Sequence, residues 1–254
     1  MRVIRPALPP DGHRRSLLTA LAMMLVGGVA GAMLAFVPAS SPGAAAVLGM
    51  AAALGLGVGG AYLLRAVQHS PQRRLSDALA ALLGGSFDDS YALVVQPRLP
   101  EVPRDLAALL VGPAAFRTIV ARDWDGHYRV RGRSWEYDAR GRRGWIACRT
   151  NPSFEAARVN DAVLRWARAA DLPSHLQVAP AIVFPMRHSR VLLEEPEDEI
   201  VTADNAPWWA QRIGKVQRLD AGEIARVVDA VMNASEQTHR QAPDRPPTTV
   251  SASR

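Results

Sequence analysis

The chain has 254 residues, a formal charge of +6 and a sequence pI of about 10.3. This length accommodates one domain with an accessory region, and the basic balance favours anionic partners such as nucleic acid or lipid headgroups. The single cysteine, Cys148, excludes an intrachain disulfide, and no Cys/His cluster has the spacing of zinc ligands.

Residues 1–15 are polar and contain prolines, so we expect a cytoplasmic tail with little fixed structure. The next two segments, Leu17–Val37 and Ala44–Leu64, contain no charged residue. Each has about 21 residues, enough for an α-helix to cross a hydrocarbon core of about 30 Å. We therefore predict a transmembrane helical hairpin over residues 16–66. A signal peptide would have a shorter apolar run, and paired core helices of a soluble domain rarely lack charge over such lengths.

Arginines flank both apolar segments, and the loop between them has none. They are Arg14 and Arg15 before the first segment, and Arg65, Arg73 and Arg74 after the second. By the positive-inside rule both termini lie in the cytoplasm. Arginine in place of lysine and abundant alanine are typical of a high-GC bacterial genome. We therefore expect a multi-pass protein of the bacterial inner membrane, with the lipid bilayer as its first partner.

Small residues recur at a spacing of four in both apolar segments: Gly27 and Gly31 in the first, Gly55 and Gly59 in the second. Glycines at this spacing let two helix backbones approach closely. They are candidates for packing the hairpin on itself or for forming a homo-oligomer. The alternative is chance, because both segments are rich in alanine and glycine throughout.

Residues 71–233 alternate between helical and strand patterns, which predicts an α/β domain with a mixed sheet flanked by helices. The continuous apolar run Val178–Phe184 is expected to be a buried central strand. The expected helices are Leu75–Leu83, Ser153–Ala170, a short one opening at Pro207, and Glu223–Met232. The other expected strands are Tyr91–Val95, Leu106–Val111, Phe116–Ala121, His127–Val130 and Ser134–Tyr137, with Val191–Leu193 and Ile200–Val201 extending the sheet. Residues 234–254 are polar and are expected to be a disordered tail.

A distinctive order of residues lies at the centre of this domain. The strand Leu106–Val111 ends in Gly112-Pro113, and a second strand, Trp135, Gly141 and the helix-opening pair Asn151-Pro152 follow. This order resembles the nuclease-related domain (NERD) family, a branch of the restriction-endonuclease-like nucleases. The resemblance covers about two-thirds of the chain and implies a restriction-endonuclease-like fold.

Nucleases of this family cut phosphodiesters with a divalent metal held by carboxylates on neighbouring strands, assisted by a lysine. The resemblance places the family's first carboxylate on Ala107, its second on Val120, its lysine on Arg122 and a glutamine on Glu155. Asp105 lies two residues before Ala107 and is the nearest acid. Valine cannot bind a cation, and arginine stays protonated with a different shape. The resemblance therefore implies a vestigial site, a pseudo-nuclease and no cofactor.

A metal-dependent nuclease with migrated carboxylates is the competing hypothesis, and it would require Mg²⁺ or Mn²⁺. The available acids are Asp105, Asp123, Asp125, Glu136 and Glu155. For each of them a solvated surface position is the simpler interpretation. Acids converging on Arg122 would favour this enzyme, whereas a basic groove without acids would favour a binding module.

Positive charge is concentrated between Arg117 and Arg149, where nine arginines face four acids. This excess suits a phosphate backbone or the anionic inner leaflet of a membrane, although arginine is also the ordinary surface cation of this chain. The candidates for such binding are Arg122, Arg129, Arg131, Arg133, Arg142 and Arg143. Trp124, Trp135 and Trp145 are expected to be packing residues.

Taken together, these patterns predict a membrane-anchored cytoplasmic pseudo-nuclease module that binds nucleic acid or a protein partner, or acts as a scaffold for them. Two alternatives remain at this point. One is the nuclease with migrated carboxylates, and the other is a structural component of a membrane assembly.

Overall fold

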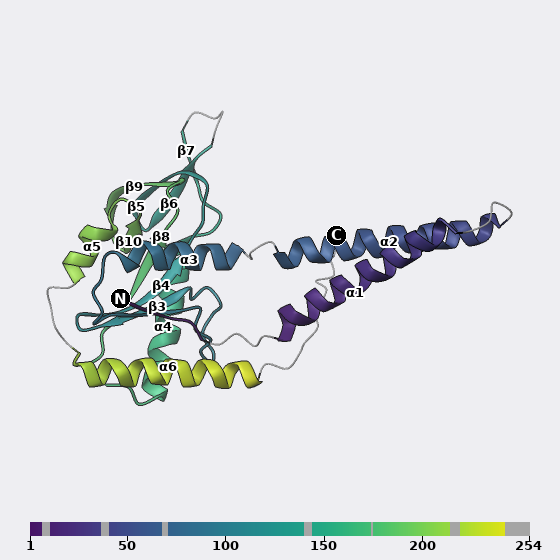
Figure 1. Ribbon diagram of the computed structural model, residues 1–254. Coiled ribbons are helices and arrows are strands. Elements are labelled where there is room, and N and C mark those ends of the chain that lie inside the picture. The colour runs from purple at the N-terminus through teal and green to yellow at the C-terminus, as the bar shows by residue number, and fades with distance from the viewer. Residues whose placement is uncertain are drawn as a thin grey trace. The chain divides into compact units, whose positions relative to one another are not determined.

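The computed structural model describes residues 1–6, 11–36, 41–67, 71–139, 144–173, 175–213 and 219–241. The chain divides into two compact units. The helical unit, Leu8–Pro71, contains two long helices, and the α/β unit combines Met1–Ala7 with Gln72–Arg254 (Figure 1). The helical unit is therefore an insertion in the α/β unit, close to its N-terminus.

The helical unit consists of α1 (Asp11–Leu34) and α2 (Pro42–Val67), which pack side by side (Figure 1). Within the described residues one segment, Pro42–Leu64, is long and apolar enough to cross a membrane, with 23 residues and a mean hydropathy that reaches 1.8. The apolar part of α1, Leu18–Leu34, is shorter, and Val37 lies outside the described residues. Of the two predicted spans, the second is supported by length and composition.

Three of the four spaced glycines lie where the two helices are closest. A Cβ added to Gly55 would lie 2.6 Å from the Cα of Gly27, and one added to Gly59 would lie 2.9 Å from the backbone nitrogen of Met24. Side-chain atoms are not found so close to backbone atoms, so only glycine fits at these positions. At Gly31 an added Cβ would meet that of Ala52 at 3.7 Å, an ordinary contact.

The α/β unit is built on a mixed six-stranded sheet flanked by helices, which confirms the predicted fold class at this level. The strand order is β1-β2-β3-β4-β8-β10, with β2, β3 and β4 antiparallel and β4, β8 and β10 parallel. Its strands are β1 (Arg2–Ile4), β2 (Ala92–Val95), β3 (Ala108–Gly112), β4 (Ala115–Ala121), β8 (Val178–Phe184) and β10 (Glu199–Thr202).

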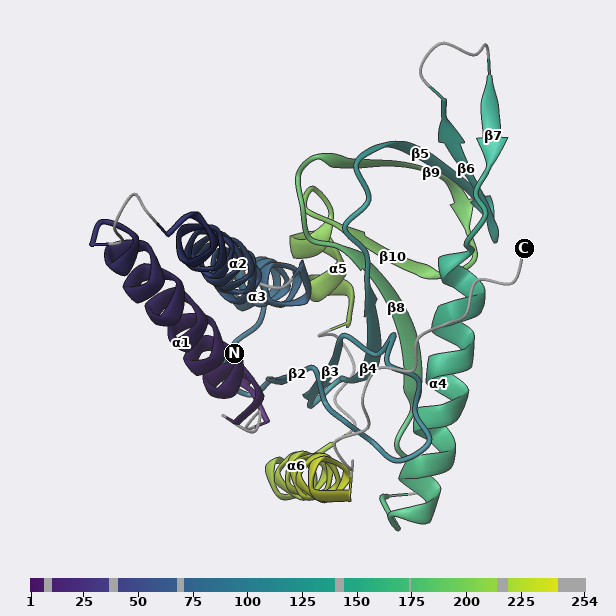
Figure 2. The ribbon, with the colours of Figure 1, turned by 90° about the vertical axis from the view of Figure 1, so that its right-hand side faces the viewer.

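Helices cover both faces of this sheet (Figure 2). One core lies between the sheet and α4 (Pro152–Ala169) with α6 (Ala221–Gln241), and the other between the sheet and α3 (Pro71–Gly84) with α5 (Ala206–Ile213). Because both faces are buried, β2, β3 and β8 are continuous apolar runs, as the sequence of β8 predicts.

A second, four-stranded sheet has the order β7-β6-β5-β9. Its strands are β5 (Gly126–Gly132), β6 (Ser134–Asp138), β7 (Trp145–Ala147) and β9 (Ser189–Pro196). The expectation that Val191–Leu193 extends the main sheet is wrong, because β9 pairs in parallel with β5. Trp135 is 3% exposed and joins this sheet to the main core through Phe184, with ring centroids 5.6 Å apart. Its Nε1 donates a hydrogen bond to Ser153 Oγ at 2.9 Å.

Both expected tails are partly structured. Residues 2–4 form β1, which pairs in parallel with β2, and the Met1 ammonium group donates to Phe87 O at 3.2 Å. At the other end, α6 continues to Gln241, and Ser235 is buried four residues after Val231 on the inner face of this helix. The start of the predicted tail, residues 234–241, is therefore helical, and residues 242–254 lie outside the described part of the chain.

Candidate functional site

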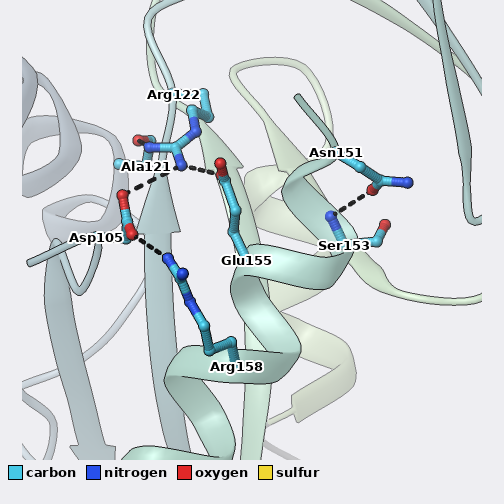
Figure 3. Close-up of polar contacts among 7 residues, drawn as sticks. All are labelled: Asp105, Ala121, Arg122, Asn151, Ser153, Glu155 and Arg158. Carbon is cyan, nitrogen blue, oxygen red and sulfur yellow. Dashed lines mark hydrogen bonds and ion pairs between the residues drawn. The ribbon is translucent and has the colours of Figure 1, made fainter. Parts of the chain in front are cut away.

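The site lies where β4 ends beside the first turn of α4 (Figure 3). Arg122 directly follows β4. Asn151 caps α4 by accepting a hydrogen bond from the Ser153 backbone N–H at 3.0 Å, and Pro152 occupies the first turn, where its missing N–H costs nothing. This capping places Glu155 in the first turn of α4, facing the end of β4.

Two carboxylates converge on the guanidinium of Arg122 (Figure 3). Arg122 Nη2 donates a hydrogen bond to Glu155 Oε2 and forms an ion pair with Asp105 Oδ1 at 3.6 Å. Arg158, one turn further along α4, donates to the other oxygen of Asp105 at 2.7 Å. All four side chains are at least partly exposed, so the cluster is an accessible network of two cations and two anions.

Only some of the five positions predicted for the vestigial site contribute a side chain to this cluster. Asp105, Arg122 and Glu155 meet, although they are distant in sequence. Val120 does not take part, because it is fully buried between the sheet and α4, opposite Ile182 of β8. Ala107 has no polar group and packs toward α3. Within the described residues no group of three His, Cys, Asp or Glu side chains could hold a metal ion.

A pocket of about 470 Å³ opens beside Arg122. Its walls are α3, the segment between β2 and β3, the end of β4 and the last turn of α6. That segment, Gln96–Ala107, is held against α6 by a hydrogen bond from the Arg98 backbone N–H to Ser235 Oγ at 3.1 Å. The charged or titratable side chains among the lining residues are Arg98, Arg104, Asp105, Arg122 and His239.

Arg98, Arg104 and His239 carry no sequence pattern that predicts their place in a site. Arg98 and Arg104 belong to an irregular segment with no motif, and His239 lies in a stretch that was expected to be disordered. The length of this segment could have drawn attention to it, because connections of about 12 residues without secondary structure are uncommon in compact domains and often carry function.

The arginines predicted to bind anions are mostly compensated by neighbouring acids. Arg129 donates to Glu136 on β6 at 2.8 Å, and Arg131 donates to Glu194 on β9 at 3.0 Å. Arg133 forms an ion pair with Glu197 at 3.2 Å. The first two pairs cross adjacent strands and the third joins two turns, so sequence spacing did not reveal them. Arg142 and Arg143 lie outside the described residues.

Comparison of the chain with protein-family models, with curated proteins and with solved structures gave no match. The resemblance to the nuclease-related domain family therefore stays a prediction, and the geometry of the site carries the functional argument.

Proposed function

We propose that the chain is a membrane-anchored module that binds an anionic partner through its α/β unit and does not hydrolyse phosphodiesters. The observation that carries this proposal is the position of the Arg122 guanidinium. It forms ion pairs with both nearby carboxylates, Asp105 and Glu155, so a permanent cation already neutralises the acids that a metal ion would need.

Electrostatics disfavours a divalent ion at this point. At about 4 Å and an effective dielectric constant of about 20, each carboxylate attracts a divalent ion by about 8 kcal/mol, and Arg122 repels it by the same amount. Arg122 thus cancels half of the attraction of the two acids, and Arg158 on Asp105 cancels more. Such ions also require several oxygen ligands, and these carboxylates already accept from arginines.

The anionic partner is proposed to contact the pocket beside Arg122. The second sheet is a weaker candidate, because its arginines Arg129, Arg131 and Arg133 already have carboxylate partners. Nucleic acid and an acidic protein surface both fit a basic pocket, and their binding would differ in salt dependence. Binding to nucleic acid would weaken steeply with salt, because phosphate contacts release counterions.

The nuclease with migrated carboxylates is the second candidate, and the convergence of Asp105 and Glu155 on Arg122 is the observation in its favour. The test is cleavage of single- and double-stranded DNA and RNA by the full chain in detergent with Mg²⁺ or Mn²⁺. We expect no metal-dependent cleavage. Cleavage that persists through repurification and is lost in both Asp105→Asn and Glu155→Gln variants would establish the enzyme instead.

The anchor is proposed to be a two-span hairpin, and the pairing of β1 with β2 supports this. Arg2 of β1 precedes α1, and its partner Ala92 of β2 follows α2, yet both strands belong to one sheet. Strands of one sheet lie in one compartment, so the chain between them crosses the membrane an even number of times. If Pro42–Leu64 spans the bilayer, the apolar part of α1 must span it as well. Its 17 residues reach about 26 Å, the short end of the range for spanning helices.

Labelling from the cell exterior tests this topology. A Ser41→Cys variant in a Cys148→Ser background places one thiol just before α2. An impermeant maleimide should label it in intact spheroplasts, whereas the native Cys148 should react only after permeabilisation. A Ser41→Cys thiol that reacts only after permeabilisation would show that the hairpin does not cross the membrane.

A further inference from the structure

The pocket beside Arg122 holds more positive than negative charge. Arg98, Arg104 and Arg122 line it, against the single carboxylate of Asp105. Asp105 is already paired with Arg122 and Arg158. In the described part of the chain no carboxylate lies within ion-pair distance of Arg98 or Arg104. The ion-pair cluster is neutral, because Arg122 and Arg158 balance Asp105 and Glu155. The two remaining positive charges, on Arg98 and Arg104, match the charge of a phosphomonoester dianion.

Arg98 is held in this pocket at an energetic cost. Burial lowers the pKa of Arg98, and the positive charge of Arg104 lowers it further. His239 is affected in the same direction, because burial and then the charge of Arg98 lower its pKa. Two residues near Arg98, Gln96 and Glu101, have positive φ angles of 53° and 59°, which is strained for side chains of this kind. A bound anion would offset the repulsion between the positive charges of Arg98 and Arg104.

The remaining walls suit a small organic molecule. Leu75 and Val102 supply apolar surface, whereas Leu79 and Leu99 line the pocket but are almost fully buried. The Thr238 hydroxyl also lines the pocket and donates to Ala234 O at 2.9 Å. The volume of about 470 Å³ falls within the range of small-molecule sites, which is roughly 300–1,000 Å³. Arginine is the residue best suited to a phosphate group, because its planar fork donates two parallel hydrogen bonds to the oxygens.

We propose that this pocket binds the phosphomonoester group of a small ligand, with Arg98 and Arg104 as the principal donors and Arg122 at the inner edge. The apolar wall formed by α3 and the Gln96–Ala107 segment would receive the organic part of the ligand. This inference rests on the proposed binding function and names the ligand class of the same site. The phosphate group could belong to a soluble metabolite such as a nucleotide, or to a lipid headgroup.

The experiment measures binding to the full chain in phosphatidylcholine nanodiscs by calorimetry. The soluble probes are inorganic phosphate, adenosine monophosphate and adenosine, and a second nanodisc preparation contains phosphatidic acid. We expect adenosine monophosphate to bind and adenosine to bind at least tenfold more weakly, because it lacks the charged group. Loss of adenosine monophosphate binding in phosphatidate nanodiscs would identify the lipid headgroup as the source, and unchanged binding a soluble ligand.

Matched variants connect binding to the pocket. Arg98→Gln and Arg104→Gln should each weaken binding about tenfold, the effect of losing a charge-assisted hydrogen bond. Arg226→Gln removes the same charge from the exposed face of α6 and should leave binding within about twofold. Because no carboxylate among the described residues pairs with Arg98, Arg98→Gln should also leave the thermal unfolding midpoint unchanged or raise it, which separates lost binding from misfolding.

Three outcomes would overturn the inference in different ways. A 20-nucleotide single-stranded DNA serves as a further probe. If the chain binds this DNA but neither adenosine monophosphate nor phosphatidate, the pocket assignment fails and the general binding function stands. If none of these ligands binds, both fail. Phosphate binding that survives in the Arg98→Gln, Arg104→Gln double variant would also refute the pocket assignment, because the donors would then lie elsewhere.

Discussion

The contact between α1 and α2 allows a quantitative prediction, because α2 has one glycine that touches α1 and another nearby that does not. A Cβ added to Gly55 would lie 2.6 Å from the Cα of Gly27, whereas one added to Gly57 would meet nothing within 4 Å. Ordinary contact begins at 3.4 Å, so Gly55→Ala must move the helices apart by 0.8 Å, the difference between these distances. Gly57→Ala requires no movement.

The expected cost follows from this displacement. Forcing one methyl group into a packed contact typically costs about 1–3 kcal/mol. The gain in helix propensity from glycine to alanine, about 1 kcal/mol, is common to both variants and cancels in their comparison. We call the hairpin closed when α1 and α2 are in contact at Gly27 and Gly55, and open when they are apart. Gly55→Ala should therefore reduce the ratio of closed to open hairpin by about 5- to 150-fold relative to Gly57→Ala, at 1.4 kcal/mol for each factor of ten.

A disulfide across the crossing reports the closed state. A Cβ at residue 31 lies 3.7 Å from that of Ala52, within the range of about 3.5–4.5 Å that disulfides require. The reporter is a Gly31→Cys, Ala52→Cys pair in a Cys148→Ser background, oxidised in detergent and followed by gel mobility. Crosslinking should be fast with Gly57→Ala and slow with Gly55→Ala. Equal rates would refute the argument that Gly55 sets the distance between the helices.

Three further predictions concern the α/β unit. Trp135→Phe leaves the buried Ser153 hydroxyl without its donor and should lower the free energy of unfolding by about 1–3 kcal/mol, measured by denaturant titration. Ser235→Ala removes the acceptor of the Arg98 N–H and should cost a similar amount, and hydrogen exchange at that amide should speed up; unchanged exchange would contradict the contact. Burial, and next the Glu136 carboxylate, raise the pKa of the Cys148 thiol, so its alkylation at pH 7.5 should be slower than in denaturant.

The sequence by itself determined the elements whose signals are local. The apolar run of β8 and the Asn-Pro start of α4 are visible because strand burial and helix capping depend on neighbouring residues. The apolar segment Pro42–Leu64 is visible for the same reason, since length and hydropathy decide whether a helix can span a bilayer. The spaced glycines were also apparent, but the sequence left open whether they make a contact.

Only the tertiary structure decided which side chains share a site. Arg122 and Glu155 are 33 residues apart, and Arg98 and Ser235 are 137 apart, so no local pattern connects them. It also decided which arginines are compensated, because ion pairs across strands depend on register. The three-residue strand β1 had too short a sequence signal to be found, and it forms because β2 offers an unpaired edge. Burial, pairing and charge balance in this protein are properties of the assembled sheet, and the chain order alone does not specify them.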